Sequence, residues 1–287
     1  MDRRESLRAA CAIAAALASR HAMASVSEAG KEEAERRHLE VMERYRSIWD
    51  GPMLEIGLLV YPGMFLQDLV GPLTMFEALL KRRIHLLWKT LDPVGPEKPD
   101  HPGLPVLPTT RFADCPERLD VLFVPGGVPG TLTMMEDQTV LDFLADRGGR
   151  AAWVTSVCTG SLILGAAGLL RGYRATSHWV TVDVLRDLGA TPVRSRVVVD
   201  RNRMTGGGVT AGLDFGLDLI GRLRSPAYAK AVQLYLEYDP RPPYNAGRPD
   251  RAPRETLGFI SEMFAGMVEA SRAAARRTAS QRGFGRG

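Results

Sequence analysis

The stretch Val154-Thr155-Ser156-Val157-Cys158-Thr159-Gly160-Ser161 contains the pattern that decides the fold. An apolar, β-prone run over residues 151–157 ends at one cysteine, and small residues that can begin a helix follow at once. This pattern is the sequence form of a nucleophile elbow, a sharp strand-to-helix turn that holds a reactive side chain above the edge of a sheet. We expect the turn to expose the sulfur of Cys158, and the free N–H groups of the new helix to favour its thiolate.

A buried structural role is the alternative for Cys158, because free cysteine is among the most buried residue types. The Cys-Thr-Gly-Ser context favours catalysis instead, since a weakly basic thiolate is a good nucleophile at neutral pH without a neighbouring histidine. We therefore interpret Cys158 as the nucleophile of an enzyme. Cys115 lies before a proline in a predicted loop and is interpreted as structural.

Apolar runs and segments of helical periodicity alternate along the rest of the chain. The predicted strands cover residues 54–61, 84–90, 119–124 and 151–157, a hairpin covers 193–205, and the predicted helices cover 71–80, 139–147, 179–188, 210–223 and 227–236. This alternation predicts an α/β fold with a doubly wound parallel sheet. Catalytic groups of such folds gather at the carboxyl ends of the strands, so we expect Asp68, Gly126-Gly127 and Cys158 on one edge.

The 287-residue chain has the composition of an ordinary globular protein, and its positive charge is concentrated at its two ends. Because the remainder is mildly acidic, no nucleic-acid partner is expected, and no apolar run is long enough for a membrane span. Residues 52–253 form the predicted catalytic domain, preceded by a charged helical extension at 25–51. Residues 254–287 form a predicted C-terminal helix and an Arg-rich tail, and we expect the tail to be disordered.

The first 24 residues have features of an export signal. Arg3 and Arg4 precede a mild apolar run at 9–18, and Ala22-Met23-Ala24 offers small residues at the positions that a signal peptidase reads. The pattern resembles a twin-arginine signal, which predicts a periplasmic protein. An uncleaved amphipathic helix is the alternative and predicts a cytoplasmic one, and a catalytic thiol is poorly suited to an oxidising periplasm.

The sequence contains no pattern for a metal or a nucleotide. Its three cysteines lack CxxC and Cys/His spacing, so neither a structural metal nor a disulfide framework is expected. The glycines at 126–127 and 206–208 match no nucleotide-binding spacing.

Asp68 lies in Phe65-Leu66-Gln67-Asp68-Leu69-Val70-Gly71-Pro72, just after the first predicted strand. An acid at such a junction is often only a helix cap. Beside a thiolate, burial and like-charge repulsion would raise the pKa of its carboxyl group, so that it stays protonated and acts as a general acid.

Other candidates end neighbouring strands. The N–H groups of Gly126 and Gly127, with that of Thr159, are expected to form an anion hole, and a plain tight turn is the alternative. His178 follows a short predicted strand. It is either the base for Cys158 or a structural histidine that fixes its loop.

Residues 54–253 resemble the DJ-1/PfpI superfamily, which has the flavodoxin-like fold of class I glutamine amidotransferases. The matching segments are Gln67 to Pro72, Phe112 to Pro116, Val124 to Gly127, Val154 to Leu170, Ala175 to Trp179, Thr205 to Phe215 and Leu236 to Gly247. Within the superfamily, the isonitrile-hydrating branch is most similar. The last segment is the informative one, because many members lack it.

The resemblance implies cofactor-free, metal-free hydration of a small molecule, an isonitrile R–N≡C, to an N-substituted formamide. By this likeness Cys158 attacks the terminal carbon to give a thioimidate, while Asp68 supplies a proton and then activates water. Thr159 is expected to orient substrate or water. The residues expected around the substrate are Gly126, Gly127, Gly160 and His178. Members of the superfamily commonly pair, which predicts a homodimer.

Other functions stay open at this point. The peptidase and glyoxalase-like branches have His directly after the nucleophile, where this chain has Thr159, so a Cys–His dyad is not favoured. Regulators of the AraC type carry a similar domain fused to a DNA-binding module, and the roughly 34 residues after Pro253 are too few for that module. A free-standing small-molecule or redox sensor is therefore the second function that we consider.

Overall fold

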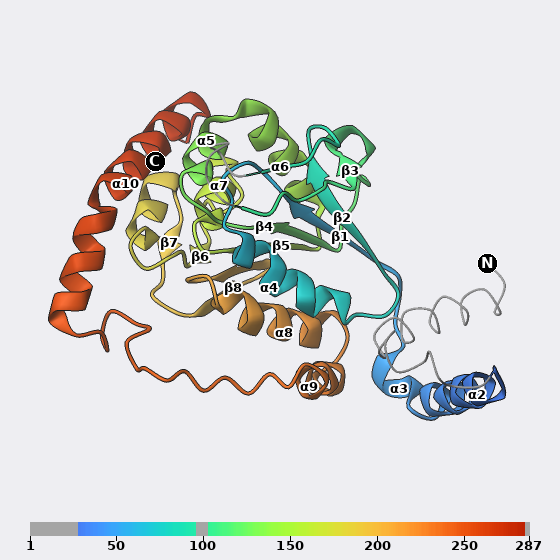
Figure 1. Cartoon of the computed structure of the whole chain (residues 1–287). Coiled ribbons are helices and arrows are strands. Elements are labelled where there is room, and N and C mark those ends of the chain that lie inside the picture. Colours follow the sequence, from blue (N-terminus) through green and yellow to red (C-terminus); the bar gives the residue numbers. More distant parts are fainter. Residues whose placement is uncertain (1–27, 96–102, 285–287) are drawn as a thin grey trace.

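The computed structural model describes residues 28–95 and 103–284, and within these ranges a seven-stranded sheet lies between two layers of helices (Figure 1). The strands are β1 (Leu54–Leu59), β2 (Arg82–Trp88), β3 (Thr110–Arg111), β4 (Val121–Val124), β5 (Trp153–Val157), β8 (Val197–Asp200) and β9 (Arg203–Gly206). Their order is β3-β2-β1-β4-β5-β9-β8, and all neighbours run parallel except the predicted hairpin, β8 with β9. The predicted doubly wound α/β fold is confirmed.

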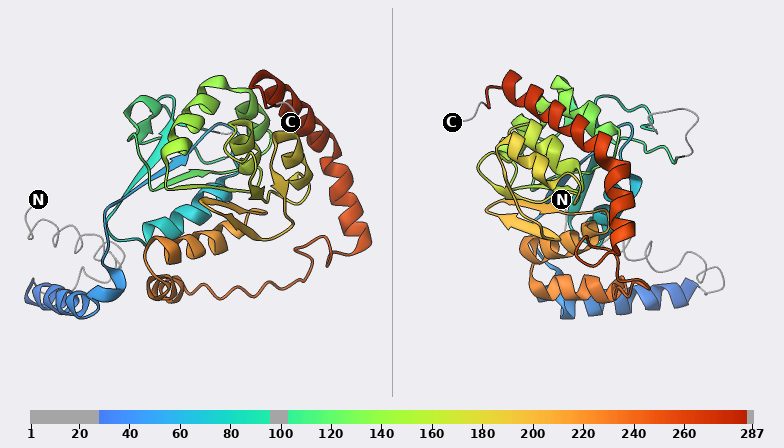
Figure 2. Two further views of the ribbon diagram at one scale, coloured as in Figure 1. Left: turned by 180° about the vertical axis from the view of Figure 1, so that it is seen from behind. Right: turned by 90° about the vertical axis from the view of Figure 1, so that its left-hand side faces the viewer.

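Helices cover both faces of the sheet, each over its own apolar core (Figure 2). One face carries α4 (Leu66–Glu77), α8 (Ala211–Leu223) and α9 (Pro226–Tyr235); the other carries α5 (Gly130–Glu136), α6 (Gln138–Arg150), α7 (Gly160–Ala166), α10 (Arg254–Gln281) and the 3-10 helix η3 (Val182–Leu188). A small second sheet pairs β6 (Arg174–Ala175) with β7 (Thr191–Pro192). Because helices cover both faces, the central strands β1, β4, β5 and β9 are buried over nearly their whole length.

Three phenylalanines hold α4 and α8 against the sheet. The Phe76 ring lies edge-on to Phe123 and to Phe215, with centroids 6.4 and 6.3 Å apart, and Phe123 stacks on Phe215 at 5.7 Å. Such aromatic pairs contribute roughly 0.5–1.5 kcal/mol each beyond the burial of their area. This packing fixes the position of α4, whose first turn carries Asp68.

Helix α4 begins at Leu66, five residues before the predicted start. Proline is favoured in the first turn of a helix. In the structure Pro72 lies inside the helix. Asp68 is therefore a helical residue of the first turn and not part of the preceding loop.

Two further elements differ from their predictions. Helix α5 was not predicted, because its start at Gly130 follows Gly-Val-Pro, a combination typical of turns. The predicted helix at 179–188 is the shorter 3-10 helix η3.

The Arg-rich end is helical as far as Gln281, which contradicts the disorder expected of it. Helix α10 runs to Gln281, and its small residues Ala274 and Ala275 are buried against α5, α7 and η3. Its arginines face acids on the body: Arg276 pairs with Asp187 at 3.3 Å, Arg277 with Glu136 at 2.7 Å, and Arg282 with Asp142 at 2.9 Å. A count of charges along the sequence did not show that these arginines lie next to acids of the body.

At the other end, α2 (Glu28–Arg44) and α3 (Arg46–Trp49) lie within the predicted charged extension at 25–51. The predicted export signal at residues 1–24 lies outside the described residues, and export stays a prediction. Among the described helices, none combines the length and apolar character that a membrane span requires.

Gly160 is expected to be required by packing at the start of α7. A Cβ there would lie 2.3 Å from the Val124 carbonyl oxygen and 2.6 Å from that of Pro125. We expect Gly160→Ala to cost about 1–3 kcal/mol of unfolding free energy, which lowers the melting temperature by several degrees.

Gly149→Ala is the matched control, because a Cβ at this position in α6 meets nothing within 4 Å. It is expected to leave the melting temperature unchanged or slightly raised, since alanine is the better helix former. Thermal unfolding followed by circular dichroism measures both variants. Equal melting temperatures for the two would contradict the packing argument.

Candidate active site

Cys158 lies between β5 and α7 with a positive φ of 58°, the backbone of a nucleophile elbow. This left-handed conformation is unfavourable for a residue with a Cβ and persists only where surrounding contacts enforce it. Here the Cys158 N–H donates to the carbonyl oxygens of Gly206 and Gly207, at 3.1 and 2.7 Å. The Cys158 carbonyl oxygen accepts from the hydroxyls of Ser161 and Ser177, at 3.2 and 3.1 Å.

The Cys158 side chain is buried, with only 7% of the residue exposed, which contradicts the expected exposed sulfur. Burial raises the pKa of its thiol well above the usual range, and the neighbouring Asp68 raises it further. The backbone N–H and the hydroxyl of Thr159 lower the pKa of this thiol, but by less than burial and Asp68 raise it. The resting nucleophile is therefore a thiol, because the apolar core that contains it removes the hydration a thiolate needs.

Asp68 is fully buried beside this thiol. Burial raises the pKa of its carboxyl group to about 6, while hydrogen bonds with Cys158 and with the N–H of Gly126 hold the pKa below what burial alone would give. Gly126 donates to Oδ2 at 3.0 Å, and Oδ1 has no hydrogen-bond partner of nitrogen or oxygen among the described residues. At neutral pH the pair is thus a carboxylate and a thiol that share one proton.

The turn after β4 binds the acid and the elbow together. The Gly126 N–H donates to Asp68, and the Gly127 N–H donates to Thr159 Oγ1 at 3.0 Å. Both N–H groups therefore have partners within the site, which contradicts the expectation that they form an anion hole. Gly126 must be glycine for steric reasons, since a Cβ there would lie 2.5 Å from the Thr159 nitrogen and 2.9 Å from Asp68 Oδ2.

Two residues of the site were not found from the sequence. Thr131 Oγ1, in the first turn of α5, lies 2.7 Å from Thr159 Oγ1, and the Tyr61 hydroxyl lies 3.4 Å from Thr131 Oγ1. Thr131 could not be placed because α5 was not predicted, and Tyr61 was assigned to the end of an apolar strand. Both side chains are buried, so their hydroxyls must be satisfied within the protein.

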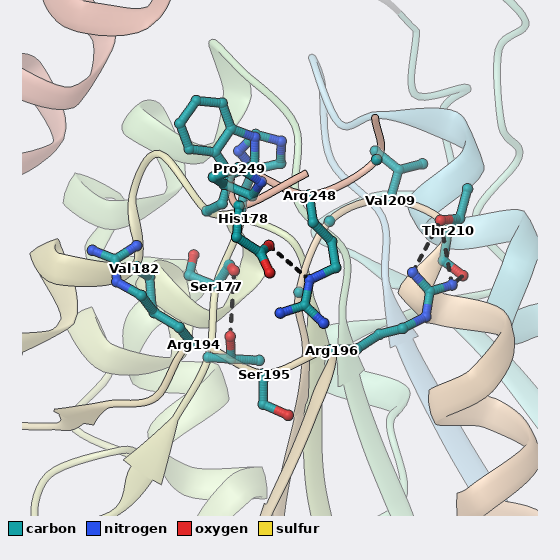
Figure 3. A pocket seen from close by; sticks show the side chains of 16 residues that line it. Ser177, His178, Val182, Arg194, Ser195, Arg196, Val209, Thr210, Arg248 and Pro249 are labelled. Carbon is teal, nitrogen blue, oxygen red and sulfur yellow. Dashed lines mark hydrogen bonds and ion pairs between the residues drawn. The ribbon is translucent and has the colours of Figure 1, made fainter. Parts of the chain in front are cut away.

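His178 lines a cavity of about 620 Å³, which Figure 3 shows with its lining side chains. Its ring packs 5.9 Å from that of Trp179 and 6.0 Å from that of Phe264, and burial lowers its pKa, so the imidazole is neutral at pH 7. Within the described residues, no hydrogen bond joins this ring to Cys158. The geometry therefore favours the structural role for His178 over the role of base.

The cavity lies next to the backbone of Cys158. Gly207 and Ser177 line the cavity, and both bind the main chain of Cys158. Its wall includes Trp179, whereas Cys158 and Asp68 do not line it.

Three arginines also line the cavity, and each is paired with an aspartate: Arg194 with Asp183, Arg196 with Asp214, and Arg248 with Asp250. Their charges are compensated locally, so the cavity suits an uncharged molecule. In the described part of the chain, no group of three or more His, Cys, Asp or Glu side chains could hold a metal ion.

The chain belongs to the DJ-1/PfpI family, whose model matches residues 56–222 and so includes the elbow and Asp68. It is 51% identical over 200 residues to an isonitrile hydratase from Pseudomonas putida, covering 70% of this chain and 85% of that protein. A crystal structure of a THiJ/PfpI family protein from Pseudomonas syringae is 51% identical, with a TM-score of 0.76 over 79% of this chain and 92% of that one. The HTH-type transcriptional regulator GbdR from Pseudomonas aeruginosa is 32% identical over 61% of this chain and 47% of that protein.

The buried Asp68 carboxylate is expected to destabilise the folded protein at neutral pH. Its pKa is raised from 3.8 to about 6, so stability falls as pH rises through this window and stays lower above it. Asp68→Asn removes the buried charge and is expected to stabilise the fold at pH 8 by up to about 3 kcal/mol.

This gain should fade between pH 6 and pH 4, where the wild-type carboxyl group becomes protonated in the folded state. Thermal unfolding across this range measures the effect, and Glu117→Gln, at an exposed position, is the control. A gain in melting temperature that does not depend on pH would contradict the assigned cause.

Proposed function

We propose that the protein is an isonitrile hydratase, a hydro-lyase that adds water to R–N≡C and releases an N-substituted formamide. The observation that carries the proposal is the buried Cys158–Asp68 pair, which has one proton for its two groups and lies next to a cavity whose arginines are paired with aspartates. The 51% identity to the enzyme of that name from Pseudomonas putida supports it.

In the first half of the reaction, the Cys158 thiol gives its proton to the Asp68 carboxylate as the sulfur attacks the terminal carbon of the isonitrile. Asp68 then delivers this proton to the same carbon. One S–C bond and one C–H bond form, and the product is the neutral thioimidate R–N=CH–S–Cys158. Asp68 returns to its carboxylate form, which a pKa near 6 permits at neutral pH.

In the second half, the Asp68 carboxylate takes a proton from water while the oxygen attacks the thioimidate carbon. Asp68 passes this proton to the nitrogen, which gives the adduct R–NH–CH(OH)–S–Cys158 and returns Asp68 to its carboxylate form. The C–S bond then breaks as the C=O bond forms, the hydroxyl proton returns to sulfur through Asp68, and the formamide R–NH–CHO leaves. The two protons of water end on nitrogen and sulfur, so the cycle needs no cofactor.

Thr159 and the cavity support these steps. The backbone N–H and the hydroxyl of Thr159 lower the pKa of the Cys158 thiol, so they stabilise sulfur wherever it carries negative charge. The cavity offers its aromatic wall to the R group, which is uncharged in this reaction class. A homodimer and export to the periplasm, or the cytoplasmic alternative, stay predictions.

A sensor is the second candidate function. The 32% identity to GbdR, an HTH-type transcriptional regulator, favours it. A sensor needs only the cavity, whereas the hydratase also needs the proton-sharing pair.

Purified protein is expected to convert cyclohexyl isocyanide to N-cyclohexylformamide. Cys158→Ala should abolish the product, and Asp68→Asn should lower kcat by about 10²–10⁴-fold, the usual contribution of a general acid–base group. Chromatography of the formamide measures both, with Glu117→Gln as the control. Reversible binding of isonitrile without turnover would instead support the sensor.

The pH dependence of hydration should reflect Asp68. Below about pH 6 its carboxyl group is protonated and can no longer accept the thiol proton, so kcat/KM should fall about tenfold per pH unit. Initial rates between pH 4.5 and 8 test this, with circular dichroism as a check of folding at each pH. A rate that stays constant from pH 8 to pH 4.5 would rule out Asp68 as the base.

A further inference from the structure

Three buried hydroxyl groups lie in a row behind the nucleophile. Thr159, Thr131 and Tyr61 are 2%, 1% and 0% exposed, and they come from the elbow, from α5 and from the segment after β1. The Oγ1 atoms of Thr159 and Thr131 are 2.7 Å apart, and Thr131 Oγ1 lies 3.4 Å from the Tyr61 oxygen. Each hydroxyl has one proton and two acceptor positions, so the direction of the row can be worked out from its ends.

At the far end, Tyr61 uses its only proton. Its hydroxyl donates to the carbonyl oxygen of Pro125 at 2.9 Å, and a carbonyl oxygen can only accept. Toward Thr131, therefore, Tyr61 is only an acceptor, and the 3.4 Å separation makes it a weak one.

At the near end, Thr159 Oγ1 already accepts from the Gly127 N–H at 3.0 Å. The Thr131 proton has a choice between Thr159 at 2.7 Å and Tyr61 at 3.4 Å, and the shorter bond is the stronger one. With donors from Gly127 and Thr131, both acceptor positions of Thr159 Oγ1 are filled. Its own proton then points away from both donors.

We propose that Thr131 is a positioning residue for the nucleophile: its hydroxyl donates to Thr159 Oγ1 and so directs the Thr159 proton toward the Cys158 sulfur. The proton stabilises sulfur when the thiol has given its own proton to Asp68, and again when the sulfur leaves the adduct. The Thr159 hydroxyl does lower the pKa of the Cys158 thiol, which agrees with this direction. The proposal rests on the proposed function only for the role of Cys158 as nucleophile.

The backbone fixes Thr131 in this arrangement. Its N–H donates to the Gly127 carbonyl oxygen at 2.7 Å, while the Gly127 N–H donates to Thr159. Gly127, Thr131 and Thr159 thus form a closed ring of three hydrogen bonds. Because the ring constrains both hydroxyl oxygens, removal of the Thr131 hydroxyl is expected to release the Thr159 proton rather than move the main chain.

Alkylation of Cys158 by iodoacetamide tests the proposal without any isonitrile turnover. Thr131→Val keeps the shape but removes the hydroxyl, and at pH 7 it should slow alkylation about threefold to tenfold, the worth of one hydrogen bond. The pH midpoint of alkylation should shift upward. Thr131→Ser restores the hydroxyl and should react at nearly the wild-type rate. Peptide mass spectrometry separates Cys158 from the other two cysteines.

Tyr61→Phe tests the direction of the row. It removes the competing acceptor of the Thr131 proton, so alkylation should be no slower than in the wild type. With cyclohexyl isocyanide, Thr131→Val should lower kcat by a similar factor and leave KM unchanged. Thermal unfolding confirms that each variant is folded, and Thr131→Ala replaces Thr131→Val if that variant is not.

Three results would overturn the proposal: a wild-type alkylation rate in Thr131→Val, an equally slow Thr131→Ser, or a Tyr61→Phe variant as slow as Thr131→Val. The last would mean that Tyr61 donates to Thr131 and is not an acceptor of its proton. Alkylation that follows the expected pattern in a protein that hydrates no isonitrile would instead overturn only the proposed function.

Discussion

The left-handed backbone of Cys158 is the constraint on which the rest of the site depends. Such a conformation costs a non-glycine residue about 1–3 kcal/mol, and four hydrogen bonds to the Cys158 main chain enforce it. Two of these bonds go to Gly206 and Gly207 at the end of β9, and one comes from Ser177 after β6. The ends of neighbouring strands therefore hold Cys158 in its strained conformation. At the elbow the chain leaves the strand, and the Cβ and sulfur of Cys158 lie toward Asp68.

Burial is the second constraint, and it changes the chemistry that the elbow can perform. An exposed elbow would give a thiolate, whereas this one raises the pKa of both Cys158 and Asp68. Ionising both groups in the apolar core would be costly. The pair therefore carries one negative charge and has one mobile proton. A pair of this kind suits the proposed hydration, because both reaction halves begin with a proton transfer to Asp68 and the thioimidate between them is uncharged.

The sequence was sufficient for the sheet, the elbow and the meeting of Asp68, Gly126 and Cys158, because strand ends of a parallel sheet share one edge. It did not predict that the Cys158 side chain is buried, or which groups the backbone N–H donors bind. Both depend on packing between segments that are distant in the sequence. The sequence showed no partner for the N–H groups of Gly126 and Gly127, whereas in the structure they donate to Asp68 and Thr159. Thr131 lay in a helix hidden by a turn-like sequence, and the arginines of α10 gave no sign of the acids on α5, α6 and η3 that they face.

The Gly126-Gly127 turn explains how a site with so few polar groups keeps its geometry. One N–H holds the acid and the next holds the residue after the nucleophile, so the distance between acid and nucleophile is set by a single backbone turn at the end of β4. Groups fixed in this way need little reorganisation when a proton moves between them, which is the main source of electrostatic catalysis in a dry site. If the protein hydrates isonitriles as proposed, the pair itself does not distinguish one R group from another, because it contacts only the reacting atoms. In the proposed reaction, discrimination among R groups falls to the cavity beside the elbow, whose Trp179 comes from the loop after β6 and whose paired arginines come from the segment between β7 and β8 and from residues 247–250.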